Sequence, residues 1–145
     1  MSEPALQEAC QPVSAISRAL NRAFRLGDGL LDWLPVGIYA CDLEGYVVQY
    51  NRRAAELWGK APDLVDGRTR FCGAHCIRTP EGDAVPFEDI PMAGVLKTGT
   101  PVRDREVIVE RPDGSRITVL VNINPLFDDD GTLIGAVNCF QDITA

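Results

Sequence analysis

Three short turns, each closing on a glycine, constrain the fold of this chain more than any other feature. They occupy residues 43–45, 112–114 and 128–131. Each lies between segments of β-forming residues, and the final glycine supplies the positive φ that a hairpin of three or four residues needs. The segments at residues 37–42, 46–51, 105–111, 116–127 and 132–144 are therefore expected to form five strands of an antiparallel sheet.

The alternation of side chains within these segments predicts that both faces of the sheet are apolar. One face would carry Tyr39, Cys41, Val47, Gln49, Val107, Val109, Val119, Val121, Ile123, Ala136, Asn138 and Phe140. The other would carry Ile38, Ala40, Val48, Tyr50, Ile108, Leu120, Val137 and Cys139. At about 25 cal/mol per Å², leaving even a few hundred Å² of either face wet would cost several kcal/mol. Both faces must therefore be covered.

The roughly fifty residues between the second and third strands are too many for a plain loop. A helix is predicted at residues 51–59, with Asn51 as N-cap and a glycine at its end. A second helix is predicted at residues 89–99, with Asp89 as N-cap and Pro91 in the first turn. This order of elements predicts an α+β fold in which a helical insert covers one face of the sheet.

The segment before the first strand offers a cover for the other face. Residues 1–13 are expected to be flexible, and residues 14–29 to form an amphipathic helix followed by a linker. The apolar stripe of this helix has helical spacing and consists of Ile16, Ala19, Leu20, Ala23 and Phe24. Because so short a helix is marginal alone, its stripe must be buried. Either this helix or the sheet of a second subunit would cover the outer face.

This arrangement resembles a PAS domain over about residues 30–144. The residues that carry the resemblance are Asp42 and Gly45 in the first turn, Asn51 at the start of a helix, RPDGS at residues 111–115 and DIT at residues 142–144. The stretch from residue 70 to residue 115 is similar to PAS modules of bacterial sensor histidine kinases. Flavin photosensors of this fold share the motif NCRFLQ, which RFCGAHC at residues 70–76 does not match, so flavin photochemistry is not expected.

The resemblance implies a five-stranded sheet whose helical insert encloses a small cavity, in a domain that senses signals in the cytoplasm. It also implies a homodimer formed through the stripe of the N-terminal helix. Output would pass to a downstream effector, such as a histidine kinase, through a segment that follows DIT. We therefore expect this chain to be the input part of a longer protein, with a stand-alone partner module as the alternative.

Charge and composition narrow the partners further. The formal net charge of −7 disfavours nucleic acid and anionic membrane surfaces, which attract clustered Lys and Arg. The most apolar stretch, residues 30–41, is interrupted by Asp32 and Pro35 and is too short to span a bilayer. The first eight residues have no basic n-region and no apolar h-region, so a secretory signal is not expected. Five scattered cysteines are more typical of reduced thiols in the cytoplasm than of an extracellular disulfide framework.

Cys72 and Cys76 flank the only histidine of the chain, His75. A structural zinc ion needs four ligands and only three are local, so no metal site is predicted. Covalent haem attachment needs Cys-x-x-Cys-His, and the order here is different. Haem held non-covalently by His75 and redox chemistry at Cys72 and Cys76 are alternatives. The simplest interpretation is packing, with Gly73 bending the insert and no cofactor bound.

Three polar residues, Tyr39, Gln49 and Asn138, fall among the apolar residues of the first face. Buried polar groups need partners, so they either pair with one another or await a ligand. The sequence contains no assembled catalytic group, which favours a ligand-binding sensor over an enzyme, with a purely structural dimerisation module as the alternative. The candidate cavity residues are Tyr39, Cys41, Gln49, Trp58, Phe71, Cys72, His75, Val109, Val121, Asn138 and Phe140.

Overall fold

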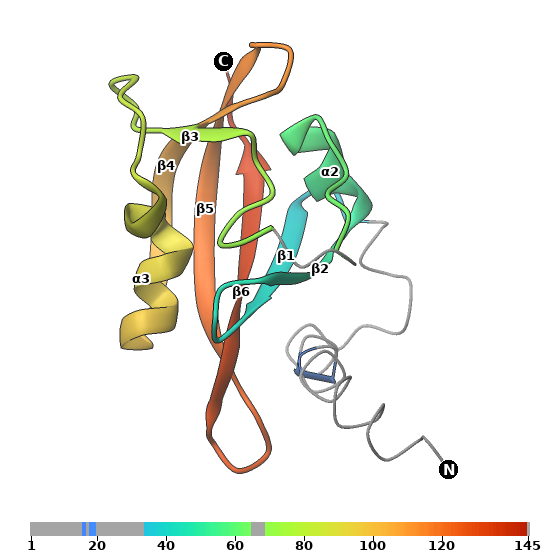
Figure 1. Ribbon diagram of the computed structural model, residues 1–145, viewed down its shortest axis with the longest axis vertical. Helices are drawn as coiled ribbons and strands as arrows, with labels where there is room; N and C mark the ends of the chain where they lie inside the picture. Colours follow the sequence, from blue (N-terminus) through green and yellow to red (C-terminus); the bar gives the residue numbers. More distant parts are fainter. Residues whose placement is uncertain (1–15, 17, 20–33, 65–68, 145) are drawn as a thin grey trace.

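The computed structural model describes residues 16, 18, 19, 34–64 and 69–144. Within them the chain forms one antiparallel sheet of six strands in the order β2-β1-β6-β5-β4-β3 (Figure 1). The strands are β1 (Gly37–Asp42), β2 (Val47–Tyr50), β3 (Cys76–Arg78), β4 (Val102–Glu110), β5 (Arg116–Phe127) and β6 (Leu133–Asp142). Helix α2 (Arg52–Trp58), the 3₁₀ helix η2 (Phe87–Asp89) and helix α3 (Pro91–Thr98) lie between β2 and β4. The predicted α+β fold with a helical insert is confirmed.

Aspartates organise the three predicted turns. Asp42 Oδ1 accepts hydrogen bonds of 3.0 Å from the backbone N–H groups of Glu44 and Tyr46. Asp113 and Asp128 accept backbone hydrogen bonds in the same way in the other two turns. The final glycines have φ between 81° and 92°, a region that only glycine enters readily. The predicted hairpin chemistry is confirmed.

The sheet has one strand more than the sequence predicted. The short strand β3 pairs with β4, with Ile77 opposite Val109, and lies at the edge of the sheet. Three residues are too few to show a side-chain alternation, and their partner strand is distant in the sequence. The prediction of five strands was wrong in this respect, because part of the insert itself joins the sheet.

The helices of the insert are short. α3 runs from Pro91 to Thr98 with Gly99 as its C-cap, so the predicted end is confirmed. The helix begins later than predicted, and its N-cap is Ile90, which makes no side-chain capping bond. Asp89 closes the preceding 3₁₀ helix η2 instead, so its predicted role as N-cap was wrong. Among the described residues, no helix has the length and apolar character needed to cross a bilayer.

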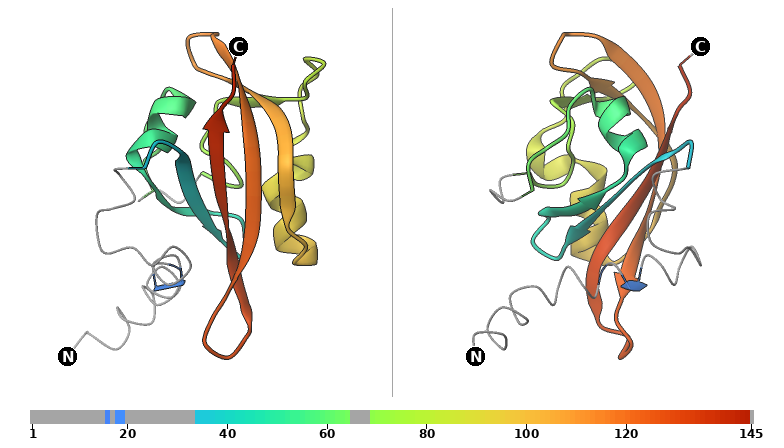
Figure 2. Two further views of the ribbon diagram at one scale, coloured as in Figure 1. Left: turned by 180° about the vertical axis from the view of Figure 1, so that it is seen from behind. Right: turned by 90° about the vertical axis from the view of Figure 1, so that its right-hand side faces the viewer.

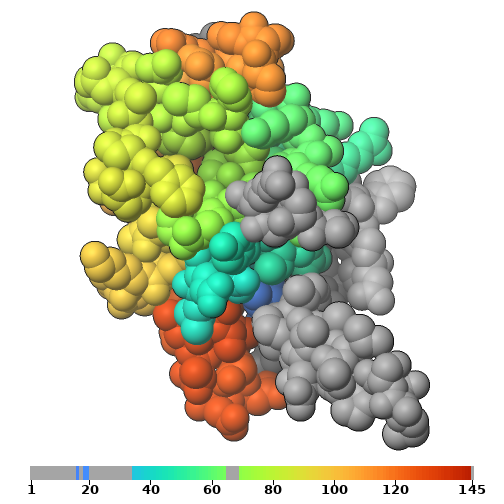
Figure 3. Space-filling view, viewed as in Figure 1, coloured from blue at the N-terminus to red at the C-terminus, as the bar shows by residue number. Residues whose placement is uncertain are grey.

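The insert covers the inner face of the sheet. α2 and α3 lie on the same side of the strands (Figure 2), and the insert hides most of the sheet when viewed from that side (Figure 3). The core there joins Ala54, Leu57 and Trp58 of α2, and Met92 and Val95 of α3, to residues of the predicted inner face. The strand residues in this core are Tyr39, Cys41, Val47, Ile77, Val107, Val109, Ile117, Val119, Val121, Ile123, Ala136 and Phe140.

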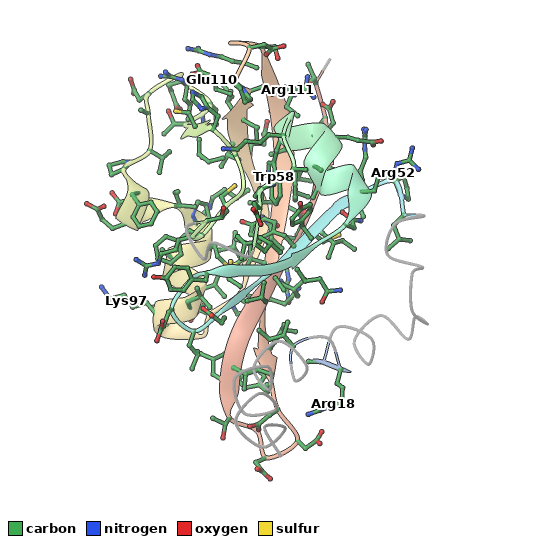
Figure 4. All side chains as sticks on the ribbon, turned by 45° about the vertical axis from the view of Figure 1, so that its right-hand side comes forward. Arg18, Arg52, Trp58, Lys97, Glu110 and Arg111 are labelled. Atoms are coloured by element: carbon green, nitrogen blue, oxygen red, sulfur yellow. The ribbon has the colours of Figure 1, made fainter. Side chains whose placement is uncertain are left out.

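The N-terminal helix contributes to the cover of the outer face. Ile16 and Ala19 are 0% and 6% exposed, and they pack in one cluster with Ile38, Ala40, Leu126 and Val137. Arg18 between them is exposed (Figure 4). Two stripe residues are therefore buried against the sheet of their own chain. Residues 1–13 and most of residues 14–29, including Leu20, Ala23 and Phe24, lie outside the described residues, so the dimer interface stays a prediction.

A bulge in β2 changes which residues face the insert. The pairing of β1 with β2 shifts after Ala40, which makes Val48 the extra residue of the bulge. Gln49 lies opposite Ala40 and therefore faces outward, whereas the ring of Tyr50 contacts Trp58 at a centroid distance of 5.6 Å. The alternation placed Gln49 on the cavity side and Tyr50 on the other face, and both assignments were wrong.

Candidate ligand-binding cavity

A small cavity lies between the insert and the inner face of the sheet. Its volume is about 20 Å³, which is room for about one water molecule. Its walls come from β1, β3, β4, β5 and β6, from the end of α2, from the start of α3 and the residue before it, and from the loop that contains Cys72. None of the described residues that line it is an Asp, Glu, Lys, Arg or His. They are Tyr39, Trp58, Cys72, Ile77, Ile90, Pro91, Met92, Val107, Val109, Val119, Val121, Ile123, Asn138 and Phe140.

Helix α2 holds Trp58 between itself and the sheet (Figure 4). The buried Asn51 caps this helix, because its Oδ1 accepts from the backbone N–H of Ala54 at 3.0 Å. The same oxygen accepts from the N–H of Ile38 at 2.9 Å, and Nδ2 donates to the carbonyl of Val36 at 3.0 Å. One side chain therefore both starts the helix and fixes it to β1.

Three aromatic rings meet at the cavity. Tyr39 and Trp58 meet edge to face with centroids 5.2 Å apart, and Trp58 stacks on Phe140 at 5.9 Å with 21° between the ring planes. Gly73 lies directly against the indole, and a Cβ there would overlap the indole ring. The glycine is therefore needed for a close approach to Trp58, whereas the sequence suggested a bend in the insert.

Asn138 on β6 is a buried polar residue that faces the cavity. Its Nδ2 donates to the hydroxyl of Tyr39 at 3.4 Å, and this hydroxyl donates to the carbonyl of Phe71 at 2.7 Å. A phenol has a single hydrogen to donate, and Phe71 takes it, so Asn138 must turn its NH₂ group toward Tyr39. Asn138 Oδ1 is left without a hydrogen-bond partner.

The indole N–H of Trp58 is a second buried polar group without a hydrogen bond. The thiol of Cys72 is nearby, and the indole is among the groups that favour its thiolate. Burial is the largest influence, however, and raises the pKa of the Cys72 thiol. A neutral thiol is only a weak acceptor, so it does not satisfy the indole. The two side chains that carry an unsatisfied acceptor and an unsatisfied donor, Asn138 and Trp58, therefore both line the cavity.

Burial also keeps the other ionisable groups near the cavity neutral. It raises the pKa of the Tyr39 hydroxyl and of the Cys41 thiol, and electrostatic repulsion from Cys72 adds to both shifts. Because the thiolate is the reactive form of cysteine, thiols with raised pKa values react slowly at neutral pH. The geometry offers no support for redox chemistry at Cys72.

Phe71 joins the cavity to the protein surface. Its backbone has φ of 65°, and its N–H donates to the carbonyl of Gly45 at 2.6 Å. Its own carbonyl accepts from Tyr39, while its ring lies 4.8 Å from that of Phe87 and beneath the guanidinium of Arg70 at 4.9 Å. A non-glycine residue in this region of φ is strained and persists only where its surroundings hold it.

Seven of the eleven predicted site residues line the cavity, namely Tyr39, Trp58, Cys72, Val109, Val121, Asn138 and Phe140. Cys41 is buried in the same core without lining the cavity. Phe71 contributes only its carbonyl oxygen to the polar chain. Gln49 faces outward. His75 is exposed.

His75 lies in a surface groove that also contains Lys60 and Arg70. A haem bound to this histidine would therefore lie outside the cavity. Among the described ranges, no three His, Cys, Asp or Glu side chains lie close enough to hold a metal ion. The groove shares the wall residues Cys72, Ile77 and Ile90 with the cavity, so the two spaces are adjacent.

Four cavity residues that the insert supplies were not predicted from the sequence. Ile77, Ile90, Pro91 and Met92 line the cavity but were not among the candidates. The sequence does indicate that Met92 and Val95 lie on one apolar face of the second predicted helix, since they are three residues apart. The position of Ile77 depends on the pairing of β3 with β4, for which three residues give no sequence signal.

Comparisons with known proteins agree with this architecture. A family model described as PAS fold matches residues 31–145. Among solved structures, the PAS domain of an HTR-like protein from Haloarcula marismortui is 20% identical, with a TM-score of 0.59 over 88% of this chain and 96% of that chain. The PAS domain of the fruit-fly ELK potassium channel is 17% identical, with a TM-score of 0.61 over 86% of this chain and 96% of that chain.

The LOV domain of the EL346 blue-light activated histidine kinase from Erythrobacter litoralis is 20% identical, with a TM-score of 0.56 over 77% of this chain and 99% of that chain. At these identities the similarity shows the fold alone. A search of curated proteins gives no match. The family match covers most of the chain, and the sheet order and the insert agree with it. The chain therefore belongs to the PAS family.

Proposed function

We propose that this chain is a sensory module that binds a small molecule in its internal cavity and passes the signal to a downstream effector such as a histidine kinase. It acts in the cytoplasm, by binding and without catalysis. The observation that supports this proposal is a pair of unsatisfied buried groups, Asn138 Oδ1 and Trp58 Nε1, on two side chains that line one cavity. Buried polar groups normally have partners, so this cavity suits a ligand that provides them.

Strand β6 offers a route from the cavity to the end of the domain. Asn138 lies in this strand, which runs on to Asp142 and toward the C-terminus (Figure 1). The strand is followed by Thr144, whose hydroxyl accepts from the backbone N–H of Thr118 at 2.9 Å and whose N–H donates to Asp142 at 2.8 Å. A ligand that pulls on Asn138 would shift β6, and this capped end would carry the shift to a following segment.

Homodimerisation is part of the same proposal. Ile16 and Ala19 occupy one end of the apolar stripe and lie against the sheet of their own chain. The interface would then use the later residues of the stripe, Leu20, Ala23 and Phe24. Two modules joined through these helices would give a ligand-dependent shift a symmetric partner to act on.

A purely structural dimerisation module is a second candidate, and the small volume of the cavity favours it. About 20 Å³ holds no more than about one water, and one water could bridge the two unsatisfied groups. A module of this kind would dimerise without binding a small molecule.

Native mass spectrometry of the gently purified chain tests the proposal. The sensory function predicts dimers that carry a non-covalent mass above that of two 15.8 kDa protomers, and a loss of this extra mass in the variant Asn138→Leu. Dimers without any added mass, from cells and after incubation with small-molecule mixtures, would favour the structural module instead.

A further inference from the structure

The hydrogen-bonding needs of the cavity are set by two atoms. Asn138 Oδ1 can only accept and Trp58 Nε1–H can only donate, and neither has a partner. Asn138 is 4% exposed and Trp58 0% exposed, so bulk water satisfies neither. The orientation of Asn138 is fixed by Tyr39, which has already used its only hydrogen on Phe71. A molecule in the cavity therefore meets a bare acceptor and a bare donor.

The charge of the walls limits what can be bound. No described residue that lines the cavity is an Asp, Glu, Lys, Arg or His, and burial raises the pKa of both Tyr39 and Cys72 so that they stay neutral. A buried ion without a partner of opposite charge is strongly disfavoured. The bound molecule is therefore uncharged.

The shape of the walls favours a flat molecule. Trp58 and Phe140 are stacked with 21° between their planes, and Tyr39 meets both rings edge to face at 5.2 and 5.9 Å. Aromatic side chains pack best against other planar groups. The remaining walls are aliphatic and add no further polar demand.

Building on the proposed sensory function, we infer that the ligand is a small, uncharged, planar molecule with one hydrogen-bond donor and one acceptor. Its donor faces Asn138 Oδ1 and its acceptor faces Trp58 Nε1. Cyclic amides and related heteroaromatic compounds, in which an N–H adjoins a C=O, have this chemistry.

A ring of this kind is larger than the empty cavity, so its entry displaces wall side chains. Met92 is unbranched and adapts readily to a new shape. Cys72, Ile77 and Ile90 line both the cavity and the adjacent surface groove of about 380 Å³ that contains His75. Movement of these three side chains joins the two spaces, which makes the groove the entrance.

Titration of the full ¹⁵N-labelled chain, followed by NMR, tests this inference with three probes. 2-Pyridone is planar and uncharged and has a donor and an acceptor, toluene has neither, and benzoate is charged. The chain has two tryptophans, and the variant Trp58→Phe identifies the indole signal of Trp58. We expect 2-pyridone to bind more tightly than the other two probes and to move this signal downfield, as a new hydrogen bond does.

Matched variants separate the hydrogen bond from general packing. Asn138→Leu should weaken the binding of 2-pyridone by about tenfold, the effect of one lost hydrogen bond in a buried site, and leave toluene binding nearly unchanged. Asn124→Leu is the matched control. Asn124 lies opposite Val137, which belongs to the hydrophobic cluster on the outer face of the sheet, so this variant should leave the affinities for 2-pyridone and toluene unchanged. If Asn138→Leu fails to fold, Trp58→Phe removes the donor and keeps a ring, and should weaken 2-pyridone alone.

The outcomes distinguish the ligand class from the sensory function. If toluene binds as tightly as 2-pyridone and Asn138→Leu affects neither, the inferred class is wrong and a ligand-binding module still stands. Preferential binding of benzoate likewise overturns the uncharged class alone. If no probe binds and the Trp58 indole contacts only a long-lived water, both the inference and the ligand-binding function are overturned.

Discussion

The hydroxyl of Tyr39 donates a 2.7 Å hydrogen bond to the backbone carbonyl of Phe71, a residue that lies 32 positions further along the chain. This bond ties the first strand of the sheet to the start of the segment that closes the cavity. It also fixes the orientation of Asn138, because it uses the only hydrogen that Tyr39 can donate. The arrangement of the cavity therefore depends on one phenol.

Tyr39→Phe should lower the free energy of unfolding by about 1–2 kcal/mol, because both Phe71 and Asn138 lose their shared partner. Urea unfolding followed by circular dichroism measures the change. Tyr46→Phe is the matched control, since this ring lies near the surface beneath Arg70 at 5.1 Å and should change stability much less. Equal effects of the two substitutions would show that the buried hydrogen bond contributes nothing.

Gly45→Ala should destabilise the protein more than Gly82→Ala. Both glycines have strongly positive φ, 92° and 98°, so both substitutions carry the same conformational cost. A Cβ at Gly45 would also overlap the ring of Phe71, whereas nothing lies within 4 Å of a Cβ at Gly82. We expect the difference between the two variants to be about 1–3 kcal/mol, typical of overpacking. Equal unfolding free energies would mean that Phe71 is not held against the first turn.

Part of the fold and of the cavity was predictable from the local chemistry of the sequence, and part was not. The three turns were predictable because aspartate and glycine create them locally. Six of the seven correctly predicted cavity residues followed from the alternation in β1, β4, β5 and β6 and from the helix that ends at Trp58, and the seventh, Cys72, came from the loop of the insert. The outward position of Gln49 was not predictable, because a bulge at Val48 leaves no mark in a run of apolar residues. Cys72 and His75 are only three residues apart in the sequence, yet Cys72 lines the cavity and His75 is exposed.

The insert was the hardest part to predict, because its structure depends on contacts with distant strands. Ile77 enters the cavity wall only because β3 pairs with β4. The left-handed conformation of Phe71 depends on Gly45 and Tyr39, which hold its N–H and its carbonyl. Neither relationship can be read from the residues of the insert alone.

Glu110 gives a prediction for the dependence of stability on pH. Its Oε1 accepts hydrogen bonds from Arg116 Nε at 2.9 Å and from Arg78 Nε at 3.0 Å. These two ion pairs link β4 to both β5 and β3. The hydrogen bond from Arg78, followed by that from Arg116, lowers the pKa of Glu110. A carboxylate with a lowered pKa stabilises the fold above its unfolded-state pKa of about 4.3, and this contribution is lost as the pH falls through the lowered value.

Glu110→Gln should therefore be less stable than the unmodified chain at pH 7, and this difference should shrink as the pH falls below about 4. Urea midpoints measured across this range test the expectation. Glu81→Gln, at an exposed turn position, is the control and should differ little at any pH. A difference for Glu110→Gln that is constant with pH would show that its carboxylate is not responsible.

The double variant Leu20→Glu with Phe24→Glu should convert dimers to monomers, because charges would replace the apolar stripe of the N-terminal helix. Size-exclusion chromatography with light scattering measures the mass directly. Arg18→Glu changes the charge of an exposed position of the same helix and should leave the dimer intact. A double variant that stays dimeric would place the interface elsewhere.

A crystal structure of the protein soaked with 2-pyridone tests most directly whether the cavity is the sensory site. If the cavity is the sensory site, we expect density for one ring beside Trp58 and Phe140, with its N–H toward Asn138 Oδ1 and its carbonyl toward Trp58 Nε1. A cavity without density for the ring, with 2-pyridone bound only on the outer surface or not at all, would contradict this role of the cavity.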